Sequence, residues 1–158
     1  MTAAPKKLLG VTIDNKLAWD QHISTIIRSS SYRLFMLRRL KTLGLPQTEL
    51  CNIFKTFILP KLTYASPAWS SSLNTTQLKK LENIQKRATK IILGPTYNDY
   101  AEAQVTLSLP SLSSIFNLNM LRFGKKVLKN PRHRHLLPPL APSRSRAIRT
   151  CNKLIPIR

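Results

Sequence analysis

A line of basic side chains on one predicted helix is the sharpest chemical feature of this sequence. Four polar residues follow one another at spacings of four, three and four: Lys79, Asn83, Lys86 and Lys90. A helix rises about 1.5 Å per residue, so this line runs along one side for about 16 Å. Lysines on such a line contact successive phosphates without reading sequence. The pattern indicates a nucleic-acid-binding face. The alternative interpretation is an ordinary solvated helix face, on which only Glu82 balances the positive charge.

A second candidate line combines basic and aromatic side chains at the same spacing. Its members are Arg28, Tyr32, Phe35 and Arg39. Aromatic rings can stack on bases, and guanidinium groups can straddle a nucleic-acid backbone. Aromatic side chains more often pack against a neighbouring helix, however, so for Tyr32 and Phe35 the sequence favours packing.

The acidic residues are too scattered for metal-dependent catalysis. There are six, of which only the last two lie close together: Asp14, Asp20, Glu49, Glu82, Asp99 and Glu102. Two-metal nucleotidyl transfer needs clustered carboxylates that hold ions about 4 Å apart. The segment Tyr97-Asn98-Asp99-Tyr100 is superficially like a polymerase turn, but it has one aspartate, and we expect a loop. We therefore expect no catalytic residue, no cofactor and no metal site in this chain.

The charge balance points to polyanionic partners. Lys and Arg total 26 against six acids, which gives a net charge of +20 over 158 residues. Nucleic acid is the natural partner of such an excess, and a neutral small-molecule substrate is not. The sequence contains no apolar stretch of about 18 residues and no signal-peptide core. We expect an intracellular protein, in the nucleus or cytoplasm, with no membrane partner.

Cysteine, histidine and the basic tail carry weaker signals. Cys51 lies on the apolar side of a predicted helix and is expected to be a buried thiol. Two distant cysteines do not make a disulfide framework, and His133, His135 and Cys151 are too few for zinc. The arginine clusters at residues 132–135 and 144–146 suit either phosphate contact or nuclear import.

Apolar periodicity predicts two helices in the first half of the chain. The first, capped by Asp20 and stopped by Gly44, covers residues 20–43 and has one apolar side: Ile23, Ile26, Ile27, Leu34 and Leu37. The second begins at Pro46, is interrupted at Pro60 and breaks at Ser66-Pro67 before Trp69. Its apolar side is expected to consist of Leu50, Ile53, Phe54, Phe57 and Ile58.

Three further helices are predicted in the second half. The helix that carries the lysine line begins at a cap, Asn74 or Thr75, and ends at Gly94-Pro95. Its apolar side comprises Leu78, Leu81, Ile84, Ala88, Ile91 and Ile92. A short helix follows over residues 100–107, and a long one covers residues 112–128 before Asn130-Pro131.

The two ends of the chain differ from this helical body. Residues 1–18 read as a strand and turn, closed at Asp14-Asn15, with no partner strand. Such an open edge would pair with a strand outside this sequence. Residues 19–130 form the helical domain. Residues 131–158 are rich in Pro, Arg and Ser without acids, so we expect an extended or disordered basic tail.

Three segments together resemble the reverse transcriptases of non-LTR retrotransposons. Residues 9–14, with Leu17-Ala18-Trp19 and His22-Ile23, are similar to the end of that family's palm. Residues 60–69 match a Pro-x-x-x-Tyr-(Gly/Ala)-x-x-x-Trp segment, and residues 81–88 match a Leu-x-x-x-Gln-x-(Arg/Lys)-Ala helix. Each segment alone is weak, whereas the combination is specific and spans most of residues 7–92.

The resemblance implies a palm-edge strand followed by a helical thumb that holds the template-primer duplex. The family's catalytic Tyr/Phe-Ala-Asp-Asp motif, which binds magnesium, would precede Lys7. On this interpretation the chain is a fragment of an RNA-directed DNA polymerase of a jockey-like or LINE-like transposable element. It would bind duplex nucleic acid and need the missing palm for polymerisation.

Two other functions remain open. A basic helical RNA- or DNA-binding or packaging protein of the host would use the same charge without polymerase ancestry. A module that docks acidic helices of another protein would use it without nucleic acid. The unpaired first strand argues against both, because a self-contained module should not begin with half a sheet.

Overall fold

The N-terminal segment is a β-hairpin. In the computed structural model, which describes residues 5–134 of the chain, β1 (Lys6–Leu8) pairs antiparallel with β2 (Val11–Ile13). The turn residues Leu9 and Gly10 have φ values of 46° and 86°, and tight two-residue hairpin turns favour such positive values at both positions. The expectation of a strand without a partner is therefore wrong. The turn was missed because leucine rarely adopts a positive φ.

The first long helix was predicted correctly, but its start is organised differently. α1 spans Asp20–Thr42, and Gly44, with φ +86°, follows its end. Asp20 is not the cap. Trp19 holds that position without a side-chain bond, and Asp14 accepts hydrogen bonds from the backbone N–H groups of Trp19 and of two residues before it. A carboxylate six residues earlier in the chain thus shapes the approach to α1.

The second helical segment continues through Pro60 by changing its winding. α2 (Gln47–Ile53) passes into the π-helical turn η1 (Phe54–Ile58) and then into α3 (Leu59–Thr63). A π turn holds more residues than an α turn, so it rotates the following side chains. Phe57 is consequently 47% exposed, against the prediction that it lies on the apolar side.

The break after this segment also differs from the prediction. It falls at Tyr64 and Ala65, where Ala65 has φ 50°, and not at Ser66-Pro67. Ser66 and Pro67 instead begin the short α4 (Ser66–Trp69), in which proline occupies the first turn, where no N–H is needed. The 3-10 turn η2 (Ser70–Ser72) leads on to the next helix.

The lysine-bearing helix begins and ends as predicted. α5 spans Thr75–Leu93 and is capped by Asn74, whose side chain accepts from the N–H of Gln77 while Gln77 bonds back to the N–H of Asn74. Gly94 follows with φ 59° and opens the 3-10 turn η3 (Gly94–Thr96). Four of the predicted apolar residues are buried: Leu81, Ile84, Ala88 and Ile92.

The remaining predicted helices are confirmed. α6 covers Tyr100–Thr106, capped by Asp99, and α7 covers Leu112–Lys129. The segment Tyr97-Asn98-Asp99 between η3 and α6 is a loop, as expected. The first compact unit ends at Phe123, and a second unit, with the end of α7 and α8 (Pro131–Arg134), begins at Gly124. The expectation that the tail is extended or disordered from Pro131 is wrong for residues 131–134, which form α8, and the rest of the tail, from His135 onward, lies outside the described residues.

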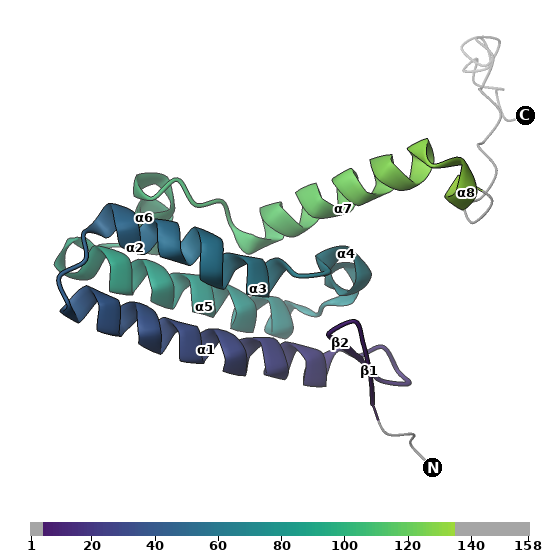
Figure 1. Cartoon of the computed structure of the whole chain (residues 1–158), viewed down its shortest axis with the longest axis horizontal. Helices are drawn as coiled ribbons and strands as arrows, with labels where there is room; N and C mark the ends of the chain where they lie inside the picture. Colours follow the sequence, from purple (N-terminus) through teal and green to yellow (C-terminus); the bar gives the residue numbers. More distant parts are fainter. Residues whose placement is uncertain (1–4, 135–158) are drawn as a thin grey trace, which may run out of the picture. The chain divides into compact units, whose positions relative to one another are not determined.

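Three helical segments form the core of the first unit. Figure 1 shows α1 and α5 running side by side in the same direction, with α2, η1 and α3 running the opposite way against them. Hydrogen bonds join α1 and α5 at both ends. At the start, Gln77 Nε2 donates to Asp20 Oδ1 at 2.6 Å, and at the finish Lys41 Nζ donates to the carbonyl oxygen of Ile92 at 3.2 Å.

Aromatic side chains close the core at the hairpin end. Trp69 is fully buried, and its ring meets those of His22 and Phe116 edge-on, with centroids 5.5 and 5.3 Å away. His22 Nδ1 accepts from the N–H of Thr12 at 3.3 Å, so it also fastens β2 to α1. Within the part of the chain that the structure describes, no helix is long and apolar enough to cross a membrane.

Candidate nucleic-acid interface

The lysine line of α5 lies on the solvent side of the helix. All four of its members are exposed: Lys79, Asn83, Lys86 and Lys90. The buried residues of α5 occupy the other side, because helical side chains separated by three or four residues share a direction. The ammonium group of Lys90 lies 5.2 Å from the ring centroid of Tyr97, a cation–π distance.

The basic and aromatic line of α1 is also exposed. Tyr32 and Phe35 are 68% and 56% exposed, and Arg28 and Arg39 are exposed beside them. The expected packing of the two rings on a neighbouring helix is therefore wrong. α1 lies at the edge of the bundle, and its core contacts are made by the opposite side, so these rings have no helix to meet within the first unit.

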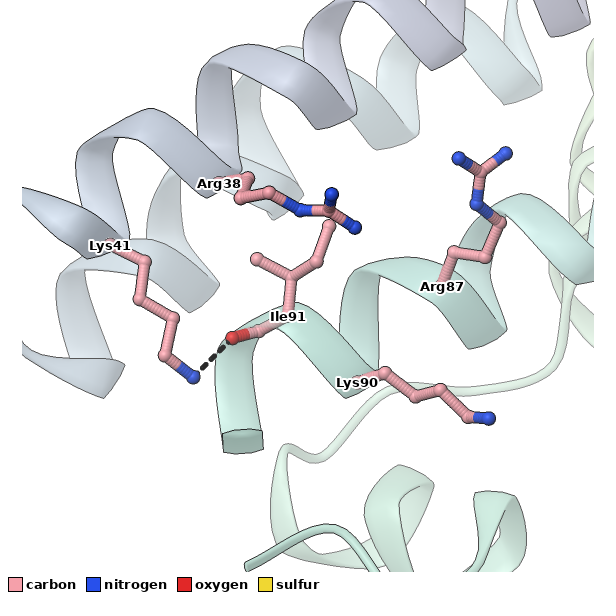
Figure 2. A pocket seen from close by; sticks show the side chains of 5 residues that line it. All are labelled: Arg38, Lys41, Arg87, Lys90 and Ile91. Atoms are coloured by element: carbon pink, nitrogen blue, oxygen red, sulfur yellow. Dashed lines mark hydrogen bonds between the residues drawn. The ribbon is translucent and has the colours of Figure 1, made fainter. Parts of the chain in front are cut away.

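The parallel packing of α1 and α5 brings further cations together. A pocket of about 290 Å³ between their C-terminal ends is lined by Arg38, Lys41, Arg87, Lys90 and Ile91 (Figure 2). Only Lys90 had been singled out from the sequence. The other cations were missed because Arg38 and Arg87 come from separate helices, and only the packing makes them neighbours. Their one local signal is a pair of cations three residues apart near the end of each helix.

Three of the six acids accept structural hydrogen bonds. Asp20 accepts from Gln77 at the N-terminal ends of α1 and α5, opposite the pocket. Glu82 accepts from the hydroxyl of Tyr100 and from the N–H of Leu112. Asp99 accepts from the N–H of Ala101 at the start of α6. These three carboxylates thus serve the packing and capping of helices.

Two pKa shifts reflect these structural roles. The N–H of Ala18, joined by those of Lys16 and Trp19, donates to Asp14, which lowers the pKa of its carboxyl below the usual value. Burial, together with the negative charge of Glu82, raises the pKa of the Tyr100 hydroxyl above its usual value. Tyr100 therefore stays protonated and keeps donating to Glu82.

The carboxylates do not fit a two-metal centre. Within residues 5–134, no three His, Cys, Asp or Glu side chains come together as a metal site would need. Asp99 and Glu102 are three residues apart in sequence. Asp99 caps the start of α6, and Glu102 accepts a hydrogen bond from the side chain of Asn98.

Some of the remaining candidate residues lie within the residues that the structure describes, and others lie outside them. Cys51 is buried, as predicted, with its thiol 3.8 Å from the carbonyl oxygen of Leu107. Arg132 is exposed in α8. His135, Cys151 and the cluster at residues 144–146 lie outside the described residues.

Polar side chains inside the core were a second class that sequence reasoning missed. Gln77, Gln85 and Thr89 are buried on α5, and Gln85 Nε2 donates to the carbonyl oxygen of Pro110 at 2.8 Å. The bond ties the middle of α5 to the loop before α7. It therefore helps fix which side of α5 is left for solvent.

Comparison with protein-family models gave no match to this chain, and neither curated proteins nor solved structures gave one. The features of this chain that bear on its function are therefore the exposed basic lines, the pocket and the sequence motifs.

Proposed function

We propose that this chain binds duplex nucleic acid as the template-primer-holding thumb of a non-LTR retrotransposon reverse transcriptase. The observation that carries the binding proposal is the pair of exposed basic lines on the adjacent parallel helices α1 and α5. Lysines and arginines on such lines replace counterions condensed on the phosphates, and the released counterions drive association. In this proposal the chain supplies no catalytic group, and a palm domain supplies the polymerase chemistry.

The polymerase part of the proposal rests on the sequence motifs. In the residue 60–69 motif, the hydroxyl of Tyr64 donates to the carbonyl oxygen of Leu9 at 2.8 Å. Trp69 Nε1 donates to the carbonyl oxygen of Tyr64 at 3.0 Å, and the indole is fully buried. The motif residues thus join the hairpin to the helices. Such a role suits a thumb that must keep a fixed position relative to a palm edge.

One observation favours a second candidate, a self-contained basic protein that binds or packages RNA or DNA. The first strand pairs with its own hairpin partner, and Val11 of that hairpin is buried against the helical core. The objection that such a protein should not begin with half a sheet therefore no longer applies. Both candidates use the same basic lines and differ in the preferred nucleic acid.

A salt titration of duplex binding tests the proposal. Affinity for a short RNA–DNA hybrid is measured between about 50 and 200 mM salt for the wild type and for a Lys79→Gln, Lys86→Gln, Lys90→Gln variant. Each lost phosphate contact lowers the steepness of the log–log slope by about 0.9 on duplex DNA, so the variant should lose about 2 to 3 units. A control variant, Lys55→Gln, Lys125→Gln, Lys126→Gln, removes the same charge from exposed positions outside both lines.

The control decides whether position or total charge matters. We expect the control variant to keep a slope within about one unit of the wild type, since its lysines lie outside both basic lines. Equal slopes for the wild type and the α5 variant would contradict the assignment of the lysine line. Tighter binding to structured RNA than to the hybrid would favour the packaging protein over the polymerase thumb.

A further inference from the structure

The pocket between the C-terminal ends of α1 and α5 has an unusual lining for its position. Of the five residues around its volume of about 290 Å³, four are cations and none is an acid. Figure 2 shows Arg38 extending from α1 over Ile91, and Arg87 standing on α5 on the far side of Ile91. The two guanidinium groups thus come from different helices, and that of Arg38 lies beside the side chain of Ile91.

The position of one of these cations, Lys41, is explained by the carbonyl groups at the helix ends. The carbonyl groups at a helix C-terminus carry partial negative charge, and two parallel helices bring two such ends together. Lys41 of α1 serves the end of α5, because its ammonium group donates to the carbonyl oxygens of Ile91 and Ile92 at 2.5 and 3.2 Å. Lys90 points away from the guanidinium groups, toward the ring of Tyr97.

Arg38 and Arg87 are not used in this way. Among the five residues drawn in Figure 2, the only hydrogen bond is that of Lys41 to Ile91, so neither guanidinium is paired within the pocket. Like charges on neighbouring helices repel one another unless an anion lies near both. Their planar donor forks suit the oxygens of a phosphate better than a single ammonium group does.

We propose that this pocket binds one phosphate group, held by Arg38 and Arg87. The inference rests on the proposed function to the extent that the phosphate belongs to a nucleic-acid backbone; inorganic phosphate offers the same oxygens. Lys90 belongs both to the pocket lining and to the lysine line of α5. A backbone that follows the line would therefore reach the pocket at the C-terminal end of the helix.

The first test uses inorganic phosphate and does not depend on nucleic acid. Thermal unfolding is followed in phosphate and in chloride at equal ionic strength, for the wild type and for an Arg38→Gln, Arg87→Gln variant. A ligand that binds only the folded chain raises Tm, and we expect a gain of about 2 to 4 °C for the wild type and none for the variant. The control, Lys55→Gln, Arg122→Gln, removes two exposed cations elsewhere and should keep the gain.

A second variant separates geometry from charge. Arg38→Lys, Arg87→Lys keeps the net charge but loses both planar forks. We expect it to unfold at the wild-type temperature in chloride and to lose most of the gain in phosphate. Its Tm in chloride also shows that a loss of binding is not a loss of folding.

The second test measures duplex binding against salt with the same variants. Removal of one phosphate contact should lower the slope by about 0.9 in the Arg38→Gln, Arg87→Gln variant, and the Lys55→Gln, Arg122→Gln control should match the wild type. If phosphate raises Tm but the wild type does not bind the duplex, the pocket is a site for free phosphate and the proposed function is wrong. If the salt dependence of duplex binding changes in the glutamine variant but inorganic phosphate does not raise the Tm of the wild type, the pocket binds a phosphate of the nucleic-acid backbone. If neither measurement distinguishes the glutamine variant from the control, the pocket proposal is wrong.

Discussion

The side-chain amide of Gln77 donates to the carboxylate of Asp20 across 2.6 Å, and this contact aligns the N-terminal ends of α5 and α1. The same amide nitrogen lies 2.7 Å from the carbonyl oxygen of Ala18. The side-chain oxygen of Gln77, Oε1, meanwhile accepts from the N–H of Asn74 in the capping box. One buried glutamine thus caps its own helix and joins it to a second one. The alignment it fixes is what brings the basic ends of the two helices together.

Gln77→Ala should destabilise the fold more than a usual cap substitution. It removes the capping-box bond and two bonds to the approach of α1, so we expect the free energy of unfolding to fall by about 2 to 3 kcal/mol. Thr76→Ala changes an exposed neighbour and should cost under about 0.5 kcal/mol. Urea unfolding measures both variants, and equal losses would show that Gln77 does not join the helices.

Glu82→Gln should loosen the attachment of α6 and α7 to α5. The carboxylate accepts from both the Tyr100 hydroxyl and the Leu112 N–H, whereas an amide has only one accepting atom. The expected loss in free energy of unfolding is about 1 to 3 kcal/mol. Glu102→Gln makes the same chemical change at an exposed carboxylate, and hydrogen exchange at the start of α7 should respond only to the Glu82 variant.

Acidification should destabilise the chain through His22. Burial, reinforced by the charge of Lys61, lowers the pKa of His22 below its usual value. The unfolded chain then binds a proton that the folded chain does not, so the free energy of unfolding falls as pH drops below about 6.5. The loss stops once folded His22 is protonated too.

Urea unfolding between about pH 5 and pH 8 measures this effect, with a slope of at most about 1.4 kcal/mol per pH unit from one histidine. His22→Gln is the matched control, since an amide can still accept from the Thr12 N–H but does not titrate in this range. A pH dependence that persists unchanged in His22→Gln would assign it to another group.

The exposed rings of α1 should contribute to binding of single strands and little to stability. Tyr32→Ala and Phe35→Ala together should weaken single-stranded DNA binding by about 1 to 3 kcal/mol per stacked base. Unfolding should change by no more than about 0.5 kcal/mol for each ring, because both already lie in solvent. A Val105→Ala, Leu121→Ala variant removes exposed apolar side chains away from α1 and should leave affinity unchanged. Unaltered affinity in the ring variant would restrict the interface to the basic residues.

Some features were accessible from sequence because their causes are local. The bounds of α5 follow from the Asn74 cap and from Gly94, and the end of α1 follows from Gly44. The exposure of the lysine line followed from helical periodicity alone, because the apolar side of α5 had to be buried. The mainly helical fold and its short helix over residues 100–106 could be predicted for the same reason.

Other features required the tertiary structure. The hairpin was hidden by a leucine at positive φ, and the exposure of Phe57 depends on a π turn that rotates its face of the helix. Whether Tyr32 and Phe35 are packed or exposed depended on which side of α1 met a neighbour. The pocket had no local signal that joins Arg38 to Arg87, because its existence depends on two helices running in the same direction. Sequence periodicity sets the side of a helix that is buried, whereas the partner it meets and the direction of that partner are decided by packing and by buried polar groups such as Gln77.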